Sequence, residues 1–340
     1  IGVRLVGSEM CIRDRFYNKD RILCMKYKVL LFVCIFVVGE LVLRFAFGFC
    51  DALLYNESDK YEYIAQPNQD RHRFGAHIYY NSYSQRNDEP DSTKVRVLGL
   101  GDSVLFGGTW MDQDSLASTL FSDETGTQML NISSGSWGPD NCAAYLKEKG
   151  TFGASAMILV CSSHDAYDVM TYVPVVGVVP TYPDRQYKLA WTELIDRYLV
   201  PRIRMMFGKT EVKLDPDEQV VKNSEFKNTV RQKSSSFNNG FVQLLDISQK
   251  KNIPMAIYLH AENDEISAGR YNEMGQKIIE WAAEHDVCLI EGLRAGETEN
   301  MYHDKIHFNE AGQRFLATQM VRLYKECLKQ TVNKEEKHVR

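Results

Sequence analysis

Five short apolar runs constrain the fold of this chain more than any other feature. Each run has the length of a strand that is buried on both faces, and amphipathic helical patterns separate most of them. This alternation predicts a parallel sheet that is covered by helices on both faces. We expect one main domain at residues 94–328, followed by a polar tail at residues 329–340. The predicted strands are Val95–Leu100, Met129–Ile132, Ala156–Cys161, Pro254–His260 and Val287–Ile290, and the predicted helices are Asp114–Phe121, Cys142–Gly150, Glu273–His285 and Ala311–Leu328.

Two segments fall outside this rhythm. Residues 51–93 form a polar, aromatic-rich lead-in segment with one candidate strand at His77–Tyr80. Residues 171–239 are an insertion that is broken by prolines, in which Lys188–Tyr198 has a helical pattern. An insertion of this length either forms a lid or substrate wall or runs over the surface, and the sequence leaves both interpretations open.

The N-terminal leader does not read as part of a fold. Residues 5–15 resemble the translation of a sequencing-library transposon end. We therefore expect residues 1–24 to be an artefact or an upstream leader, and Met25 to be the natural start. Segments of this kind are set aside when a fold is inferred.

Residues 25–49 read as a membrane anchor or an export signal. Lys26 and Lys28 precede the apolar stretch, and this arrangement keeps an N-terminus inside and sends the following domain out of the cytoplasm. An uncleaved anchor of about 20 residues is favoured, with Glu40 and Arg44 pairing near the outer face. A cleaved signal peptide and a buried helix of a soluble domain are the alternatives. We therefore predict a single-pass protein of the cell membrane whose main domain lies in the periplasm or at the cell surface.

Charge and cysteine spacing argue against two classes of protein. The formal net charge is −5 at pH 7, which argues against a nucleic-acid-binding surface. The cysteines of the main domain form no CxxC pair, which argues against a zinc ribbon. Cys161 and Cys288 lie in apolar runs and are expected to be buried thiols.

The first predicted strand ends abruptly at Gly101-Asp102-Ser103. Ligand sites in open parallel sheets lie at the carboxyl ends of the strands, and this turn would place Ser103 there. Ser103 is therefore a candidate nucleophile, although Asp102 or Ser103 would serve equally well as the N-cap of a helix. No Gly-Lys-Ser/Thr follows, so the turn is not a phosphate-binding loop.

A second polar motif, Asp304-Lys-Ile-His307, precedes the last predicted helix. A carboxylate three residues before a histidine can orient the ring through one nitrogen and leave the other to take a proton from Ser103. A metal site shared by His303 and His307, which are four residues apart, is one alternative, although no third ligand is evident nearby. An ordinary surface pair of Asp304 and His307 is the other.

Together these motifs resemble the SGNH/GDSL hydrolase superfamily. The similarity covers roughly residues 95–325 and extends to membrane-anchored bacterial members that are linked to cell-surface polysaccharide. It implies a three-layer α/β/α sandwich with a five-stranded parallel sheet, in a flavodoxin-like arrangement. It also implies that Ser103 is the nucleophile, His307 the base and Asp304 the acid that orients the base.

The resemblance further implies an oxyanion hole. One donor would be the backbone N–H of Ser103, and a second would be the N–H of Gly135, or of Ser136 if the motif is shifted by one residue. The third block of the family reads Gly-x-Asn-Asp, whereas this chain has Ser162-Ser163-His164-Asp165. His164 therefore stands where an asparagine donor is expected. It would compensate as a donor, suit a different substrate or mark a weakened enzyme.

Two other residues near the predicted carboxyl edge have competing interpretations. His260, which is followed by Glu262, would line the site or, as we favour, form a structural hydrogen-bonded histidine. Trp137 would stack on a sugar ring or belong to the core, and the core is favoured.

We therefore predict a serine ester hydrolase that forms an acyl-serine intermediate. The resemblance to the superfamily implies that it removes O-acyl groups, with acetyl as the expected group, from a carbohydrate or polysaccharide. The resemblance implies neither a metal nor an organic cofactor. One alternative is an O-acetyltransferase of a cell-surface polysaccharide that uses the same triad. The other is a non-catalytic carbohydrate-binding protein on the same scaffold. The expected partners are the acylated substrate and the membrane, with no nucleic acid, and the oligomeric state stays open.

Overall fold

The chain folds around a five-stranded sheet with the strand order β11-β10-β7-β5-β6. The computed structural model describes residues 6–206 and 231–328. All neighbouring strands in this sheet are parallel, as the alternation of strands and helices predicted. The strands are β5 (Arg96–Gly101), β6 (Gln128–Ser133), β7 (Ala156–Ser162), β10 (Met255–His260) and β11 (Cys288–Glu291).

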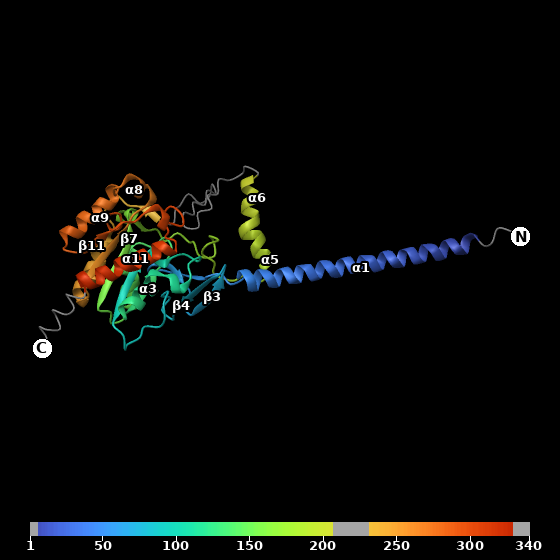
Figure 1. The fold of residues 1–340 in the computed structure, drawn as a ribbon, viewed down its shortest axis with the longest axis horizontal. Coiled ribbons are helices and arrows are strands. Elements are labelled where there is room, and N and C mark those ends of the chain that lie inside the picture. The colour runs from blue at the N-terminus through green and yellow to red at the C-terminus, as the bar shows by residue number, and fades with distance from the viewer. Residues whose placement is uncertain (1–5, 207–230, 329–340) are drawn as a thin grey trace.

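Helices cover both faces of the sheet, so the predicted three-layer sandwich is confirmed (Figure 1). Successive strand residues point to opposite faces, and in β7 Ile158 and Leu159 belong to different core clusters. On one face the sheet packs against α3 (Ala117–Thr125) and α11 (Glu310–Leu323). On the other it packs against α4 (Pro139–Lys149), α7 (Asn239–Lys251) and α9 (Glu273–Glu284). Helix α7 is a helix that the sequence analysis did not predict.

The lead-in segment is more regular than predicted. Its candidate strand is present as β4 (Ala76–Tyr80), but it pairs with β3 (Gln69–Arg73), and β1 (Tyr55–Ser58) pairs with β2 (Glu62–Ala65). Both hairpins bury aromatic side chains, which are spaced too irregularly in the sequence to read as strands. The remaining short elements of the described chain are α2 (Ser103–Phe106), η1 (Gln113–Ser115), η2 (Ser163–Ala166), α8 (Asn263–Ala268), α10 (Gly292–Ala295), η4 (Glu299–Met301) and η5 (Tyr324–Leu328).

The insertion contains the predicted helix, which is longer than expected. It runs without interruption through α5 (Ala190–Glu193), η3 (Leu194–Leu199) and α6 (Val200–Met206). Two short strands, β8 (Asp168–Met170) and β9 (Arg231–Lys233), pair at its base. Part of the predicted insertion, 207–230, and the predicted polar tail, 329–340, lie outside the described residues.

The N-terminal apolar stretch is part of a long helix, α1 (Val6–Phe47). Its segment Leu23–Phe47 is long and apolar enough to cross a membrane, with a mean hydropathy of 2.5 over 18 of its residues, and none of the segment is buried by the rest of the protein. This exposure argues against a core helix, whereas a membrane anchor and a signal sequence both fit. The expected pair of Glu40 and Arg44 is present, with 2.6 Å between Nε of Arg44 and Oε1 of Glu40.

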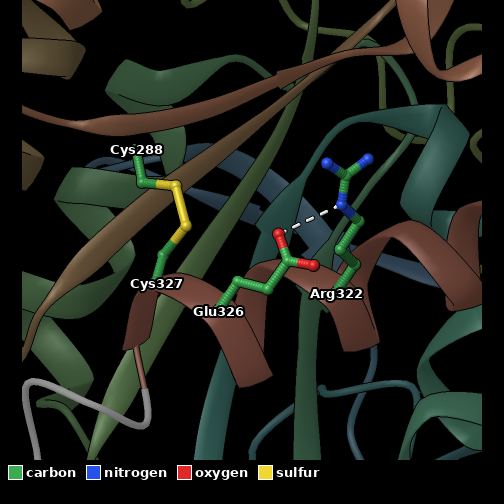
Figure 2. Close-up of a disulfide and its surroundings, with 4 residues drawn as sticks. All are labelled: Cys288, Arg322, Glu326 and Cys327. Atoms are coloured by element: carbon green, nitrogen blue, oxygen red, sulfur yellow. Dashed lines mark hydrogen bonds and ion pairs between the residues drawn. A yellow bond between two sulfur atoms is a disulfide. The ribbon is translucent and has the colours of Figure 1, made fainter.

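A disulfide joins Cys288 to Cys327 (Figure 2). The prediction of a free buried thiol at Cys288 was therefore wrong, because the partner lies on the last helical turn, which the sequence could not place beside β11. The bridge ties the first residue of β11 to η5, at the amino edge of the sheet. Arg322 and Glu326 form an ion pair on the same C-terminal helix.

Candidate active site

The strand-to-helix turn after β5 places Ser103 at the carboxyl edge of the sheet. Gly101 closes the strand where a Cβ atom would lie 2.8 Å from the carbonyl oxygen of Val160, so the close approach of β5 and β7 requires a glycine. Asp102 then caps α2 by accepting the N–H of Val104 at 2.8 Å. The sequence left open whether Asp102 or Ser103 caps the helix. In the structure Asp102 is the N-cap, and the buried Ser103 begins the helix with its hydroxyl available to the loop that carries His307.

Three side chains form one continuous chain of hydrogen bonds. Nε2 of His307 lies 2.9 Å from Oγ of Ser103, and Nδ1 of His307 lies 2.7 Å from Oδ2 of Asp304. Ser103 and His307 are 204 residues apart in the sequence, and the fold brings them together. Since both ring nitrogens of His307 face these two partners, the arrangement leaves none for the metal site that was considered with His303.

Asp304 is held in its ionised form. Burial favours the neutral acid, but hydrogen bonds from the His307 ring and from the N–H groups of His307 and Ile306 outweigh it and lower the pKa of Asp304 to about 2. A carboxylate that is negative at neutral pH keeps the proton of His307 on Nδ1. Nε2 is then the nitrogen that can accept a proton from Ser103.

The second block presents its backbone to the same edge. The carbonyl oxygen of Gly135 accepts the hydroxyls of Tyr63 at 2.8 Å and Tyr182 at 3.3 Å. In a trans peptide the N–H points opposite to the carbonyl, so the N–H of Ser136 faces away from the two tyrosines. Ser136 has φ of 56°, a left-handed conformation that orients this short turn. These contacts set the direction of the Ser136 N–H more firmly than that of Gly135.

His164 lies beside the turn that carries Asp102 and Ser103, among carboxylates. Its Nδ1 is 3.0 Å from Oε1 of Glu262, and a ring nitrogen lies within 4.8 Å of carboxylate oxygens of Asp102 and Asp165. Burial opposes a charge on the ring, but the Glu262 hydrogen bond and the charges of Asp165, Glu262 and Asp102 raise the pKa of His164 to about 10. His164 is therefore a charged donor at neutral pH.

Asp165 completes this group. Its Oδ2 accepts the N–H of Ser162 at 2.9 Å, while Oδ1 is buried without a hydrogen-bond partner among the described residues. Burial and the nearby Asp102 charge raise the pKa of Asp165, and His164 acts in the opposite direction. The three side chains Asp102, His164 and Asp165 have the donor types of a metal site. Nδ1 of His164 and Oδ2 of Asp165 are already engaged within the protein.

The two ambiguous residues of the sequence analysis are structural. His260 is fully buried, with Nδ1 3.1 Å from Glu297 and Nε2 2.7 Å from the carbonyl oxygen of Ile306. Burial opposes its charge, but Glu297 outweighs this and raises the pKa of His260. His260 thus holds the loop between Asp304 and His307 through the backbone of Ile306. Trp137 is 1% exposed and donates its indole N–H to the Tyr63 carbonyl, so it belongs to the core.

Sequence reasoning missed two residues of this region. Arg86, from the lead-in segment, is fully buried and donates to the carbonyl oxygens of Phe106, Gly108 and Met111, so it holds the loop that follows Ser103. Trp110 stacks on His303 at 4.8 Å and turns its ring edge-on to His307 at 5.5 Å. No sequence motif identifies Arg86. For Trp110 the only signal in the sequence is its position shortly after the turn that carries Ser103.

The fold and this site define a three-layer α/β/α protein with a serine, a histidine and an aspartate aligned at the carboxyl edge of its parallel sheet. No protein-family model matches the chain, and no curated protein matches its sequence. Solved structures do match, and they include the G-D-S-L family that its motifs resemble.

The matches have low sequence identity. A lipolytic protein of the G-D-S-L family from Veillonella parvula is 12% identical, with a TM-score of 0.37, over 68% of this chain and 99% of that chain. A psychrotrophic esterase from Pseudoalteromonas is 13% identical, with a TM-score of 0.38, over 69% and 98%. A carbohydrate acetylesterase family member from Sinorhizobium meliloti is 11% identical, with a TM-score of 0.37, over 69% and 99%. Identities and TM-scores at this level do not transfer a substrate or a catalytic residue to this chain.

Proposed function

We propose that this protein is a serine ester hydrolase of the SGNH/GDSL type. The hydrogen-bonded series Ser103–His307–Asp304 carries the proposal, because three residues from distant parts of the sequence meet with the distances that nucleophilic acyl transfer needs. A helix cap alone would need neither His307 nor the carboxylate behind it. The intact series likewise argues against a protein that only binds carbohydrate.

The proposed reaction follows from the geometry. Oγ of Ser103 attacks the ester carbonyl carbon while its proton passes to Nε2 of His307, and the carbonyl oxygen becomes an oxyanion. Asp304 stabilises the imidazolium through Nδ1. Collapse of the tetrahedral intermediate expels the alcohol, which takes the proton from Nε2 and leaves an acyl-serine. Water then repeats the same sequence and releases the carboxylic acid.

The oxyanion hole would be formed by backbone and side-chain donors together. The N–H of Ser103 and an N–H of the second block, Gly135 or Ser136, are the backbone candidates, and the peptide orientation described above favours Ser136. His164 would supply the third donor. Its raised pKa means that it donates as an imidazolium, and a charged donor forms a stronger hydrogen bond than the neutral amide of an asparagine. On this basis His164 compensates for the missing asparagine rather than weakening the enzyme.

We infer that the substrate is an O-acylated carbohydrate, the class to which the resemblance of the motifs points. Trp110 gives the site an aromatic wall beside His307, and its indole N–H is buried without a partner in the described part of the chain. The support from Trp110 is therefore the position of its ring, since an aromatic side chain at the wall of a site can stack on the apolar face of a sugar. Acetyl is the acyl group that we favour.

We also infer that the domain lies outside the cytoplasm, anchored by α1. Lys26 and Lys28 lie within the first six residues of the candidate span Leu23–Phe47, as expected for a cytoplasmic N-terminal end. The disulfide between Cys288 and Cys327 supports this placement, since disulfides persist in oxidising compartments and are rare in the cytosol.

Hydrolysis of p-nitrophenyl acetate by the full-length protein in detergent tests the proposal. We expect turnover that is lost in both Ser103→Ala and His307→Ala and kept in Ser267→Ala, an exposed serine on α8 that serves as the matched control. Equal rates in all four proteins would refute the esterase. Turnover that rises when a sugar acceptor is added, with acetyl appearing on the sugar, would assign the same triad to an acetyltransferase.

A further inference from the structure

The helix that continues through α5, η3 and α6 begins against the side of α1 and runs across its direction (Figure 1). The junction is specific. The Glu40 carboxylate accepts the N–H groups of Ala190 at 2.8 Å and Trp191 at 3.2 Å. The Trp191 indole donates to the carbonyl oxygen of Phe36 at 3.0 Å and stacks on the Phe36 ring at 5.7 Å. These contacts fix the start of the crossing helix to one level of α1.

The crossing helix has its polar side inward. Glu193 is fully buried and pairs with Arg73 at 2.5 Å and with Arg197 at 3.0 Å. Tyr198 packs beside Phe49 on the same side, with 5.6 Å between ring centroids. Glu193 and Arg197 are therefore turned toward the domain, whereas Asp196 and Arg202 of the same helix are exposed.

The outward side is apolar. Ile195, Leu199, Ile203 and Met206 recur at helical spacing and are 44%, 42%, 50% and 82% exposed. A surface helix in water shows the opposite pattern, with its apolar side packed and its charges outside. We therefore expect this apolar face, Ile195–Leu199–Ile203–Met206, to contact an apolar environment in the native protein.

The position of α1 identifies this covering. A helix rises about 1.5 Å per residue, and the candidate span ends at Phe47, so the junction at Glu40 lies seven positions, or roughly 10 Å, inside the outer end of the span. Amphipathic helices of the interface bury their apolar side to a similar depth, about 5–10 Å into the boundary between headgroups and acyl chains. A helix that leaves α1 sideways at this level runs along the surface of the bilayer that α1 would cross. Trp191 also suits this level, because tryptophan is enriched where lipid tails meet the headgroups.

We propose that the helix Ala190–Met206 lies in the membrane interface and buries its apolar face, Ile195–Leu199–Ile203–Met206, among the lipid acyl chains. It is then a second contact with the bilayer, beside α1, of the kind that amphipathic interfacial helices make. Two contacts that run in different directions prevent the domain from swinging about the anchor and hold its site at a set orientation above the surface. This inference rests on the proposed anchoring by α1 and is independent of the esterase activity.

Photolabelling by lipids tests the inference in the full-length chain. The protein is reconstituted in vesicles of phosphatidylethanolamine and phosphatidylglycerol that contain a phosphatidylcholine with a diazirine in its acyl chain. After irradiation, lipid adducts are mapped by mass spectrometry. We expect adducts on α1 and on Leu199, Ile203 or Met206. The double variant Leu199→Gln/Ile203→Gln should lower the yield on this helix at least about tenfold, while Asp196→Asn, an exposed position beside the apolar face, should leave it unchanged.

Each other outcome would overturn the inference in a distinguishable way. Adducts on α1 alone would show that the chain is anchored but that the crossing helix does not reach the lipid. Adducts on neither helix would remove the anchor as well. An oligomer in detergent that the double variant converts to monomers, with no lipid adducts on Leu199 or Ile203, would assign the apolar face to a second copy of the chain.

Discussion

Replacement of Asp304 by asparagine should destabilise the fold as well as impair the reaction. The wild-type pKa falls from its ordinary value of 3.8 to about 2, and the side chain is 23% exposed. One pKa unit corresponds to about 1.4 kcal/mol, so ionised Asp304 stabilises the folded state by about 2 kcal/mol at neutral pH. In Asp304→Asn we expect the free energy of unfolding to fall by about that amount.

The pH dependence has a definite sign. The folded pKa lies below the unfolded one, so the stabilisation is complete above about pH 4 and is lost as the pH falls toward about 2. Urea unfolding of the detergent-solubilised protein at pH 7 and pH 3 measures this. The difference between wild type and Asp304→Asn should shrink by roughly half at pH 3.

Glu310→Gln is the matched control for this experiment. Glu310 pairs with Arg314 on the exposed surface of α11, and such pairs contribute less than about 1 kcal/mol. A stability difference for Asp304→Asn that is no larger than that of Glu310→Gln, or that does not change with pH, would refute the reasoning. Esterase activity should fall on the order of 10³–10⁴-fold in Asp304→Asn only, because the amide no longer holds His307 in the required tautomer.

Three further predictions concern His164, the buried pair of His260 and Glu297, and the disulfide. His164→Ala should lower kcat on the order of 10²-fold, whereas His164→Asn should retain most of the wild-type kcat. In pH–rate profiles corrected for uncatalysed hydrolysis, only the wild type should lose activity as the pH rises through about 10, where His164 loses its proton. Glu297→Gln should cost about 3–5 kcal/mol, since it leaves the buried His260 charge unpaired; thermal unfolding that matches wild type would contradict this. Replacing Cys288 and Cys327 with serine should cost about 2–4 kcal/mol in urea unfolding and leave kcat unchanged, because the bridge lies at the opposite edge of the sheet; a loss of kcat would count against that placement.

Local sequence was sufficient for the sheet but not for the lead-in segment. Strands such as Ala156–Ser162 are buried on both faces, so each appears in the sequence as an uninterrupted apolar run. The hairpins β1–β2 and β3–β4 use tyrosines and charged residues at irregular spacing, and their strand character comes from pairing and from packing on the main domain. A pattern that only tertiary contacts impose leaves no period in the sequence.

The same contrast holds within the site. Ser103, Asp304 and His307 could be proposed from the sequence because a strand end, a glycine turn and a short acid–histidine spacing are local features. The chemistry of His164 could not, since its charge depends on Glu262, a residue 98 positions away that meets it only at the sheet edge. The role of Arg86 could not be predicted from the sequence either, because the three carbonyl oxygens that its guanidinium binds come together only in the folded protein.

The sequence by itself thus determined the five strands of the parallel sheet, the candidate triad and the apolar stretch of α1, because each depends on neighbouring residues along the chain. Only the tertiary structure decided which groups are charged, how the peptide between Gly135 and Ser136 is oriented, and which cysteines pair. It also decided that the helix Ala190–Met206 turns its apolar side outward. Burial and the distance between charges set these properties, and both are products of packing between segments that are remote in the sequence.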